Sequence, residues 1–563
     1  MQQPILPIPF VDKRYFIRLL EIFPGAITWM FLLGPIILSV THPVIVAYFI
    51  IAFDLLWLIK ALRLSYYLIR GNRKMKNTES IDWNAKLLLL EDIPKSIIQI
   101  KSELDELRFK YPKILHKIPF SSKLFPKKLR YQFLIKELAE LEDLQKRHAT
   151  LLNPKDLINV VILATYNEGI EIIEPSIEAL LKSEYNLKQV WLFIAYEVRG
   201  GQEVGENAKR LAQKYREKFG LTMAIGHPDG IEGEIRGKGG NITYAGRKLA
   251  ELVTERDIDP EHVIVTTLDA DNRPSKRYFA NLSYKYATNV NRVHCSYQPV
   301  AIFFNNIWDV SAPMRVIATG NSFWNLMESM RPHRLRNFAA HAQSLRTLLD
   351  TDFWSTKTIV EDGHQYWRTY FAYDGDHHVV PLFSPVYQDA VLAKGYWRTF
   401  TVQYKQLRRW AWGVSDFPYV VRNSIKNDRI PWSDKLVQIW RLFEGHLSWA
   451  TAPLIITFVA SMPLYLNHTF AQQVLAHQLP VIAGWIMTIA LVGLLATVFV
   501  SMLSLPPKPS KYRHSRTVAM VLQWVLSPFT TIIFNAVAAI DAQTRLMFGK
   551  YLEFQVTEKA TKP

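Results

Sequence analysis

The sequence predicts an α/β domain with a mostly parallel sheet, inserted between the apolar helices of a polytopic membrane protein. Runs without charged side chains stand near both ends of the 563-residue chain. Short apolar runs alternate with helical patterns in its middle. Asp269 and Asp271 directly follow one of these runs, in VIVTTLDADNRPS. Because a buried carboxylate requires a cation or a hydrogen-bonding partner, the aspartate pair indicates a ligand site.

The uncharged runs predict membrane-spanning helices. No Asp, Glu, Lys or Arg occurs in residues 22–53, and THP at 41–43 divides this run into two spans. Residues 447–466 and 481–505 are two further uncharged runs. Each of the four pieces is near the roughly 20 residues that a spanning helix needs. The run 518–540 is long enough, but its proline and scattered polar side chains favour helices in the membrane interface, or a re-entrant pair.

The flanking loops predict the orientation of these spans. Residues 60–76 contain six basic residues and no acid, and residues 506–517 contain four and no acid. Residues 467–480 contain no Lys or Arg. By the positive-inside rule we expect the region between the two pairs of spans, and both termini, to lie in the cytoplasm at the inner membrane.

The net charge and the cysteine count indicate which classes of partner and metal site the protein can have. The formal net charge is +17, which anionic lipid headgroups explain without a nucleic acid, and no nucleic-acid-binding motif accompanies the charge. We therefore expect a lipid bilayer and no nucleic acid as partner. Cys295 is the single cysteine, which excludes an intrachain disulfide and a cysteine-based metal cage.

These patterns divide the chain into eight segments. They are a cytoplasmic N-terminal segment (1–21), two transmembrane helices (22–63), a basic and amphipathic helical region with an expected pair of helices (64–154), the α/β domain (155–415), an interface helix region (416–446), two transmembrane helices (447–505), a cytoplasmic loop with interfacial or re-entrant helices (506–548) and a C-terminal tail (549–563).

The α/β domain begins with the apolar run INVVILAT, and QVWLFIAYE, TMAIGH and HVIVTTLD follow, separated by helical patterns. In parallel sheets, ligands bind beyond the carboxyl ends of the strands. Thr165 to Glu168, Glu197 and the aspartate pair all fall there. Hard oxygen ligands suggest Mg²⁺ or Mn²⁺, which brings phosphates with it. Because neither GxxxxGK[ST] nor GxGxxG follows the first strand, the phosphate substrate suggested is a nucleotide sugar.

Several motifs carry a specific resemblance. They are TYNE (165–168), KGGN (238–241), DAD (269–271), VED (360–362), QLRRW (406–410) and FQVTEK (554–559). With these motifs in this order, the chain resembles membrane-integrated family-two glycosyltransferases of the cellulose synthase and hyaluronan synthase type. The resemblance covers roughly residues 155–415 and the C-terminal tail. It implies a GT-A (Rossmann-like) catalytic fold.

The resemblance also implies roles for individual residues. Nucleotide-sugar binding would involve Thr165, Tyr166, Glu168, Glu197, Lys238, Asn241 and Asp269; metal binding Asp269 and Asp271; base catalysis Asp362 with Glu361; diphosphate or acceptor binding Gln406, Arg409 and Trp410; and a gating loop Phe554, Val556, Thr557 and Lys559. Two positions depart from the family's pattern. Glu197 stands where relatives usually have an aspartate, and Val360 replaces the threonine of TED.

The implied reaction is inverting transfer of a sugar from a nucleoside diphosphate, UDP being the expected one, to a saccharide acceptor, with processive β-glycan synthesis as the expected product. The metal would neutralise the departing diphosphate. Lys238 and Arg409 could stabilise the same oxygens, and Asp362 would accept the proton of the acceptor hydroxyl.

Each assignment has a structural alternative. The DAD aspartates could form an Asx-turn, Lys238 could lie in a solvated turn, and VED could be a solvated helix start. Residues 408–412 could be a basic and aromatic membrane-interface belt. DGDHH (374–378) could be a second metal motif.

The function has alternatives too. One is non-processive transfer to a polyprenyl-phosphate or another lipid-linked acceptor, which the low number of spans favours. Another is a transporter or scaffold whose domain is inert. Few spans also suggest a homo-oligomer or an export partner.

Overall fold

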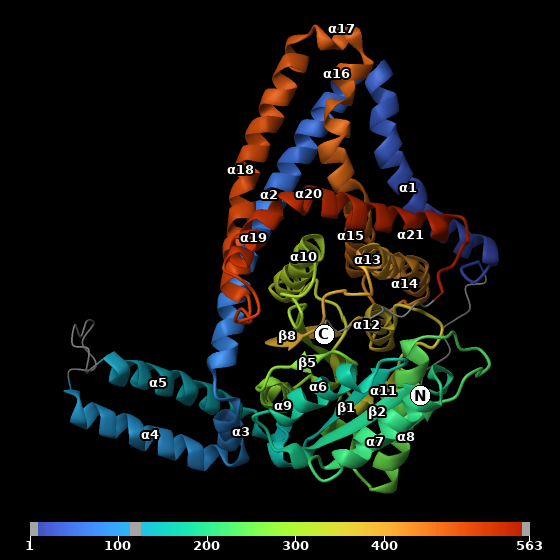
Figure 1. Cartoon of the computed structure of the whole chain (residues 1–563). Coiled ribbons are helices and arrows are strands. Elements are labelled where there is room, and N and C mark those ends of the chain that lie inside the picture. The colour runs from blue at the N-terminus through green and yellow to red at the C-terminus, as the bar shows by residue number, and fades with distance from the viewer. Residues whose placement is uncertain (1–9, 113–124, 554–563) are drawn as a thin grey trace.

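The computed structural model describes residues 10–112 and 125–553. A bundle of long apolar helices stands on an α/β body, and a helical hairpin projects from that body (Figure 1). The predicted gating loop, Phe554, Val556, Thr557 and Lys559, lies outside the described residues.

The body contains an eight-stranded mixed sheet with the strand order β3-β2-β1-β4-β7-β6-β8-β5. The strands β1 to β4 pair in parallel, as the sequence predicts. In the other half, β7 is antiparallel to both β4 and β6, and β5 is antiparallel to β8. The strands are β1 Ile158–Thr165, β2 Val190–Glu197, β3 Leu221–His227, β4 Val263–Asp269, β5 Arg273–Pro274, β6 Cys295–Ile302, β7 Ala342–Ser344 and β8 His378–Tyr387.

Both faces of the parallel half are buried, which explains why its strands are continuously apolar. Alternate residues of β1 enter different cores: Val161 and Leu163 join one cluster, and Val160 and Ile162 join another. Helices cover these faces. They are α6 Ile170–Leu181, α7 Gln202–Lys214, α8 Lys238–Glu255, α9 Tyr278–Thr288 and α11 Leu345–Asp350. A further helix, α12 Glu361–Ala372, bonds to β7 through Gln365 and Gln343.

Four helices are long and apolar enough to cross a membrane, or five if one bent pair counts as a span, among the described residues. This is compatible with a membrane protein. Residues 447–466, predicted as one span, are bent by 47°. Pro463 has no N–H for a continuous helix and instead sits at the start of a new one. The helices of the bundle are α1 Arg14–Thr41, α2 Pro43–Ser80, α15 Trp432–Thr457, α16 Met462–Leu466, α17 His468–Ala471 and α18 Val474–Ser504.

The fourth apolar segment by length and composition, Ser515–Met547, takes a different course. It runs crosswise beneath the bundle instead of alongside α1, α2 and α18 (Figure 1). For residues 518–540 we expect either helices in the membrane interface or a re-entrant pair, and the crosswise course is compatible with the first of these. The segment comprises α19 Ser515–Leu522, α20 Ser527–Thr530, the π-helical turn η11 Thr531–Ala536 and α21 Val537–Met547.

The amphipathic region forms the predicted helix pair. Glu103 of α4 pairs with Arg130 of α5, and Lys101 pairs with Glu142, so the two helices lie side by side. They project from the body in Figure 1. The helices outside the bundle and the sheet layers are α3 Trp83–Glu91, α4 Ile93–Lys110, α5 Phe125–Lys146, α10 Ala312–Ser329, α13 Tyr396–Ala411 and α14 Asp416–Lys426.

Helix α21 connects the bundle to the body. Asp541 Oδ2 accepts hydrogen bonds from Arg408 Nη1 at 2.8 Å and from the Tyr404 hydroxyl at 3.0 Å, both on α13. On its other side, Gln543 Oε1 accepts a 2.6 Å bond from the Thr28 hydroxyl of α1. The helix that carries QLRRW is therefore fixed to a candidate membrane span through α21.

Cysteine labelling tests this course of Ser515–Met547. We expect Arg513→Cys and Lys550→Cys, at exposed positions before and after the segment, to react with a membrane-impermeant maleimide only after cells are permeabilised. Gln472→Cys, in the exposed loop between α17 and α18, should react in intact cells. The native Cys295 is buried and gives little background. Labelling of positions 513 and 550 from opposite sides would show that the segment crosses the membrane.

Candidate active site

The carboxyl ends of three strands meet at one edge of the sheet, as predicted. In the registers of the parallel pairs, Ala164 lies beside Asp269 and Thr165 lies beside Tyr196. Thr165, Glu197 and Asp269 therefore end neighbouring strands. The loops and helices that follow these strands build the site.

Lys238 is the centre of the charged cluster. It is the first residue of α8, and its Nζ lies 3.0 Å from Asp269 Oδ1 and 3.4 Å from Asp362 Oδ2. Glu361 Oε1 is 3.8 Å from the same nitrogen. Glu361 and Asp362 are the first two residues of α12, and Glu361 is buried. The alternatives of a solvated turn at Lys238 and a fully solvated VED are therefore wrong.

The cluster shifts the pKa values of its members. Burial lowers the pKa of Lys238, but the charges of Asp269, Asp362 and Glu361 outweigh burial and hold it above the ordinary 10.5. Burial, together with the charge of Asp362, raises the pKa of Glu361 to about 8. Burial lowers the pKa of Arg409 below its ordinary value, although the charges of Glu361, Asp269 and Asp362 act in the opposite direction. The guanidinium of Arg409 therefore interacts with the same carboxylates as Lys238.

Asp269 and Asp271 fit a divalent cation that also binds the phosphates of a substrate. Asp269 and Asp271 offer hard carboxylate oxygens one residue apart, and Asp271 Oδ2 is oriented by a 3.0 Å hydrogen bond from the backbone N–H of Asp389. No group of three or more His, Cys, Asp or Glu within residues 10–112 and 125–553 could hold a metal alone. Two carboxylates suit Mg²⁺ or Mn²⁺ when substrate phosphates complete the coordination.

A second polar group lies at the ends of β1 and β2. Glu168 Oε2 accepts the backbone N–H of Tyr166 at 2.8 Å, and the Arg199 guanidinium stacks over the Tyr166 ring at 4.5 Å. Buried Glu197 accepts a hydrogen bond from Arg199 Nε. Arg199, which the sequence analysis did not single out, therefore links the three residues predicted to contact the nucleoside. The sequence feature that could have identified Arg199 is its position two residues after Glu197.

Asn241 has a structural role in addition to its predicted one. Its Nδ2 donates to the carbonyls of Ala195 at 2.9 Å and Thr165 at 3.3 Å. These bonds hold the first turn of α8, and with it Lys238, against the ends of β1 and β2.

Helix α13 brings QLRRW to the site. Gln406 accepts a 3.1 Å hydrogen bond from Gln403, and the half-buried Trp410 packs against Phe303. A pocket of about 200 Å³ opens beside Arg409. It is lined by Lys405, Arg408, Arg409, Arg545, Tyr551, Leu552 and Glu553. Its excess of cations suits an anionic ligand, and the chain enters the predicted gating loop directly after it.

The second D-x-D motif has other partners. Asp374 accepts hydrogen bonds from Arg429 and Asn427, and Asp376 bonds to His294. Ion pairs and hydrogen bonds with neighbouring side chains therefore account for both aspartates of DGDHH.

Sequence reasoning missed one residue that lies next to Asp362 and a second residue that bonds to the first. His341 Nδ1 is 3.6 Å from Asp362 Oδ1, and the indole of Trp354 donates to the other nitrogen of His341 at 3.1 Å. Neither residue belongs to a motif of the resemblance, so no sequence signal identified them.

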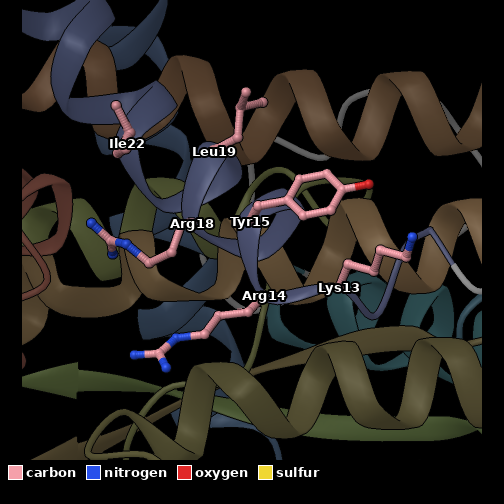
Figure 2. A pocket seen from close by; sticks show the side chains of 6 residues that line it. All are labelled: Lys13, Arg14, Tyr15, Arg18, Leu19 and Ile22. Atoms are coloured by element: carbon pink, nitrogen blue, oxygen red, sulfur yellow. The ribbon is translucent and has the colours of Figure 1, made fainter.

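A larger hollow, of about 850 Å³, lies at the start of α1. It is lined by Lys13, Arg14, Tyr15, Arg18, Leu19 and Ile22, none of which is a predicted site residue. Figure 2 shows Lys13 and Tyr15 extending to one side of the helix and Arg14 and Arg18 to the other. Basic and aromatic side chains at the end of an apolar helix are typical of the headgroup region of a membrane.

Comparison with known proteins yields weak likenesses only. No family model and no curated protein matches the chain. Among solved structures, the mannosyltransferase PcManGT from Pyrobaculum calidifontis, in complex with GDP-Man and Mn²⁺, is 14% identical over 82% of this chain and 100% of its own, with a TM-score of 0.39. S. aureus TarS 1-349 in complex with UDP-GlcNAc is 12% identical over 71% and 94%, with a TM-score of 0.30. GalNAc-T7 with UDP, GalNAc and Mn²⁺ is 12% identical over 54% and 58%, with a TM-score of 0.28. At these scores the likeness supports no argument about function.

The Lys238 cluster predicts an asymmetry between two lysines of α8. Lys238→Met leaves Asp269 and Asp362 without the cation that they share, and removing one partner of a buried charge cluster costs about 3 kcal/mol. Lys248→Met removes an exposed i,i+3 pair with Glu251, whose loss costs under about 1 kcal/mol. We expect thermal unfolding in detergent at pH 7 to show a lower midpoint for Lys238→Met only. Equal midpoints for the two variants would contradict the role of Lys238.

Proposed function

We propose that the chain is an inverting glycosyltransferase that moves a sugar from a nucleoside diphosphate, UDP in the first instance, to a saccharide acceptor. One observation carries the proposal: Asp269 of DAD and Asp362 of VED, far apart in the sequence, approach the same ammonium group, that of Lys238 in KGGN. Arg409 of QLRRW lies in the field of these groups. The residues proposed to bind the diphosphate and the residue proposed as the base thus lie at the same edge of the sheet.

The chemistry follows from this arrangement. The acceptor oxygen bonds to the anomeric carbon as the bond from that carbon to the diphosphate oxygen breaks. Lys238 and Arg409 stabilise the negative charge of the leaving diphosphate. A divalent cation bound by Asp269 and Asp271 would supply further neutralisation of that charge.

Asp362 takes the proton of the acceptor hydroxyl in this proposal. It stays 20% exposed at its side chain, so an acceptor can reach it, whereas Glu361 is buried. With a pKa of about 8, Glu361 is largely protonated at pH 7. When Glu361 is neutral, Asp362 has one negatively charged neighbour fewer, which suits general base catalysis by Asp362.

We extend the proposal to a processive β-glycan synthase of the membrane-integrated family-two type. QLRRW, the C-terminal FQVTEK and the apolar helices support this extension. Residues 551–553, which directly precede FQVTEK, line the same pocket as Arg409.

A lipid-linked acceptor is the second candidate. The small number of apolar helices favours it, four or five in the part of the chain that the structure describes. A single copy with so few helices would need further copies or an export partner to surround a polymer.

The first test offers a panel of nucleotide sugars to the purified protein in nanodiscs with Mg²⁺ or Mn²⁺ and measures the nucleoside diphosphate released. We expect release from one donor, and a loss of about 10²- to 10⁴-fold in Asp362→Asn because the base is removed. A high-mass product supports processive synthesis, whereas a single-sugar lipid supports the second candidate. No release from any donor would favour an inert transporter or scaffold domain.

Metal removal is a separate prediction. EDTA should abolish release by the wild type, and excess Mn²⁺ or Mg²⁺ should restore it, because the site depends on cation neutralisation of the diphosphate. Asp271→Asn should raise the Mn²⁺ concentration needed for half-maximal rate. Unchanged release in EDTA would mean that Lys238 and Arg409 suffice without a metal.

A further inference from the structure

The hydrogen bonds around His341 fix the position of its proton. Trp354 Nε1 can only donate, and it donates to His341 Nε2 at 3.1 Å, so Nε2 is the acceptor. The ring proton is therefore on Nδ1 and is donated to the carbonyl of Phe338 at 2.9 Å, whereas Asp362 Oδ1, at 3.6 Å from the same nitrogen, lies just beyond hydrogen-bond distance. Burial lowers the pKa of His341, which favours the neutral ring that this pattern requires.

The backbone beside both residues is held in an uncommon conformation. Ala340, directly before His341, has φ 69°, and Asp352 and Phe353, directly before Trp354, have φ 49° and 55°. Left-handed backbone at non-glycine residues is disfavoured and persists where the surrounding structure imposes it. Left-handed residues thus directly precede both His341 and Trp354, which are hydrogen-bonded to each other.

The surroundings that impose these turns are the catalytic elements themselves. The backbone N–H of Thr267, on the strand that ends at Asp269, donates to the His341 carbonyl at 3.2 Å. Thr243 of α8 donates to the carbonyl of Trp354 at 2.9 Å, and Arg368 of α12 donates to the carbonyl of Phe353. The pair is therefore tied to the elements that carry Asp269, Lys238 and Asp362.

Two groups lie beside the carboxylate of Asp362, and two more interact with it electrostatically. Lys238 approaches from α8, His341 from the segment before β7, Glu361 from its own helix, and Arg409 acts from α13. Lys238 also lies against Asp269, on the diphosphate side. When a diphosphate attracts the ammonium of Lys238, the Nδ1–H of His341 is the neutral donor next to Asp362.

We propose that His341 is a positioning residue for Asp362, and that Trp354 acts through it by keeping the His341 proton on Nδ1. This inference rests on the proposed function. As Lys238 turns to the diphosphate, Oδ1 of Asp362 moves closer to His341 and shares the Nδ1–H with the Phe338 carbonyl. This bond aims Oδ2 at the acceptor hydroxyl. In the opposite tautomer a lone pair would face both Asp362 and the Phe338 carbonyl.

The first experiment removes the indole donor and keeps the aromatic bulk. We expect Trp354→Phe to lower kcat about 10- to 100-fold, the range typical of groups that orient a reacting side chain, with the KM for the donor unchanged. The control is Trp83→Phe. Trp83 is also buried and donates to a backbone carbonyl, that of Thr78 at 3.0 Å, but lies before α4 and away from the site. Its kcat should stay at the wild-type value.

The second experiment separates the two nitrogens of His341. An Asn side chain can present an N–H near the place of Nδ1, whereas Gln presents one near Nε2. We expect His341→Asn to lose less than about tenfold in kcat and His341→Gln about 100-fold. In an Asp362→Asn background, Trp354→Phe should cause no further loss, because the residue it positions is gone. A purely structural role predicts equal effects of Asn and Gln, with lower thermal midpoints.

Two outcomes must be distinguished. If the wild type releases a nucleoside diphosphate and Trp354→Phe keeps its kcat, the positioning role is wrong and the proposed function stands. If the wild type is inactive with every donor, the proposed function fails. The pair is then tested by ¹⁵N NMR of histidine-labelled protein, with His341→Gln used to assign the signal. The His341 signal should have the Nδ1–H pattern in the wild type and lose it in Trp354→Phe, and an Nε2–H pattern in the wild type would overturn the inference.

Discussion

The site depends on one electrostatic constraint: parallel strands deliver their polar ends to one edge, and the carboxylates gathered there need a cation. Lys238 meets that need at the first turn of α8, where Asn241 holds the helix against the ends of β1 and β2. Partial burial strengthens every charge interaction in the cluster and makes an unpaired carboxylate costly. The positions of α8 and α12 relative to the sheet are therefore set by charge as well as by apolar packing.

The same constraint ties together the two halves of the proposed reaction. An ammonium shared between Asp269 and Asp362 cannot bind a diphosphate without changing its contacts to both. Donor binding and the environment of the proposed base are consequently linked through one side chain. The buried Glu361, with its raised pKa, limits how much negative charge the cluster holds near neutral pH.

Much of this arrangement could be predicted from the sequence, because it follows from strand ends and motifs. The parallel half of the sheet and the helix pair were expected from local patterns, whereas the resemblance implied that Asp269, Glu361, Asp362 and Arg409 share one site. The central position of Lys238 could not be predicted, because a sequence motif identifies a residue but does not give the position of its side chain in the folded chain. Asn241 shows the same limit, because its amide is used on two strand carbonyls.

Other features depend on tertiary contacts that no local pattern contains. Arg199 joins Glu197 to Tyr166 through stacking, and the pairing of His341 with Trp354 depends on left-handed turns at Ala340, Asp352 and Phe353. The bend after Thr457 follows from a proline that begins the next helix, which a count of uncharged residues does not register. Composition identifies the crosswise segment Ser515–Met547 as apolar, whereas its direction becomes visible only in the folded chain.

The connection through α21 has a mechanical consequence. Thr28 of α1 bonds to Gln543, and Asp541, two residues earlier, bonds to Arg408 and Tyr404 on the helix that carries Arg409. A helix that crosses a bilayer adjusts its tilt to the thickness of the hydrocarbon layer. If α1 spans a bilayer, as its length and composition allow, a change in its tilt would act on α13 through these side-chain bonds. The thickness of the lipid layer would then be a physical variable of the helix that carries Arg409.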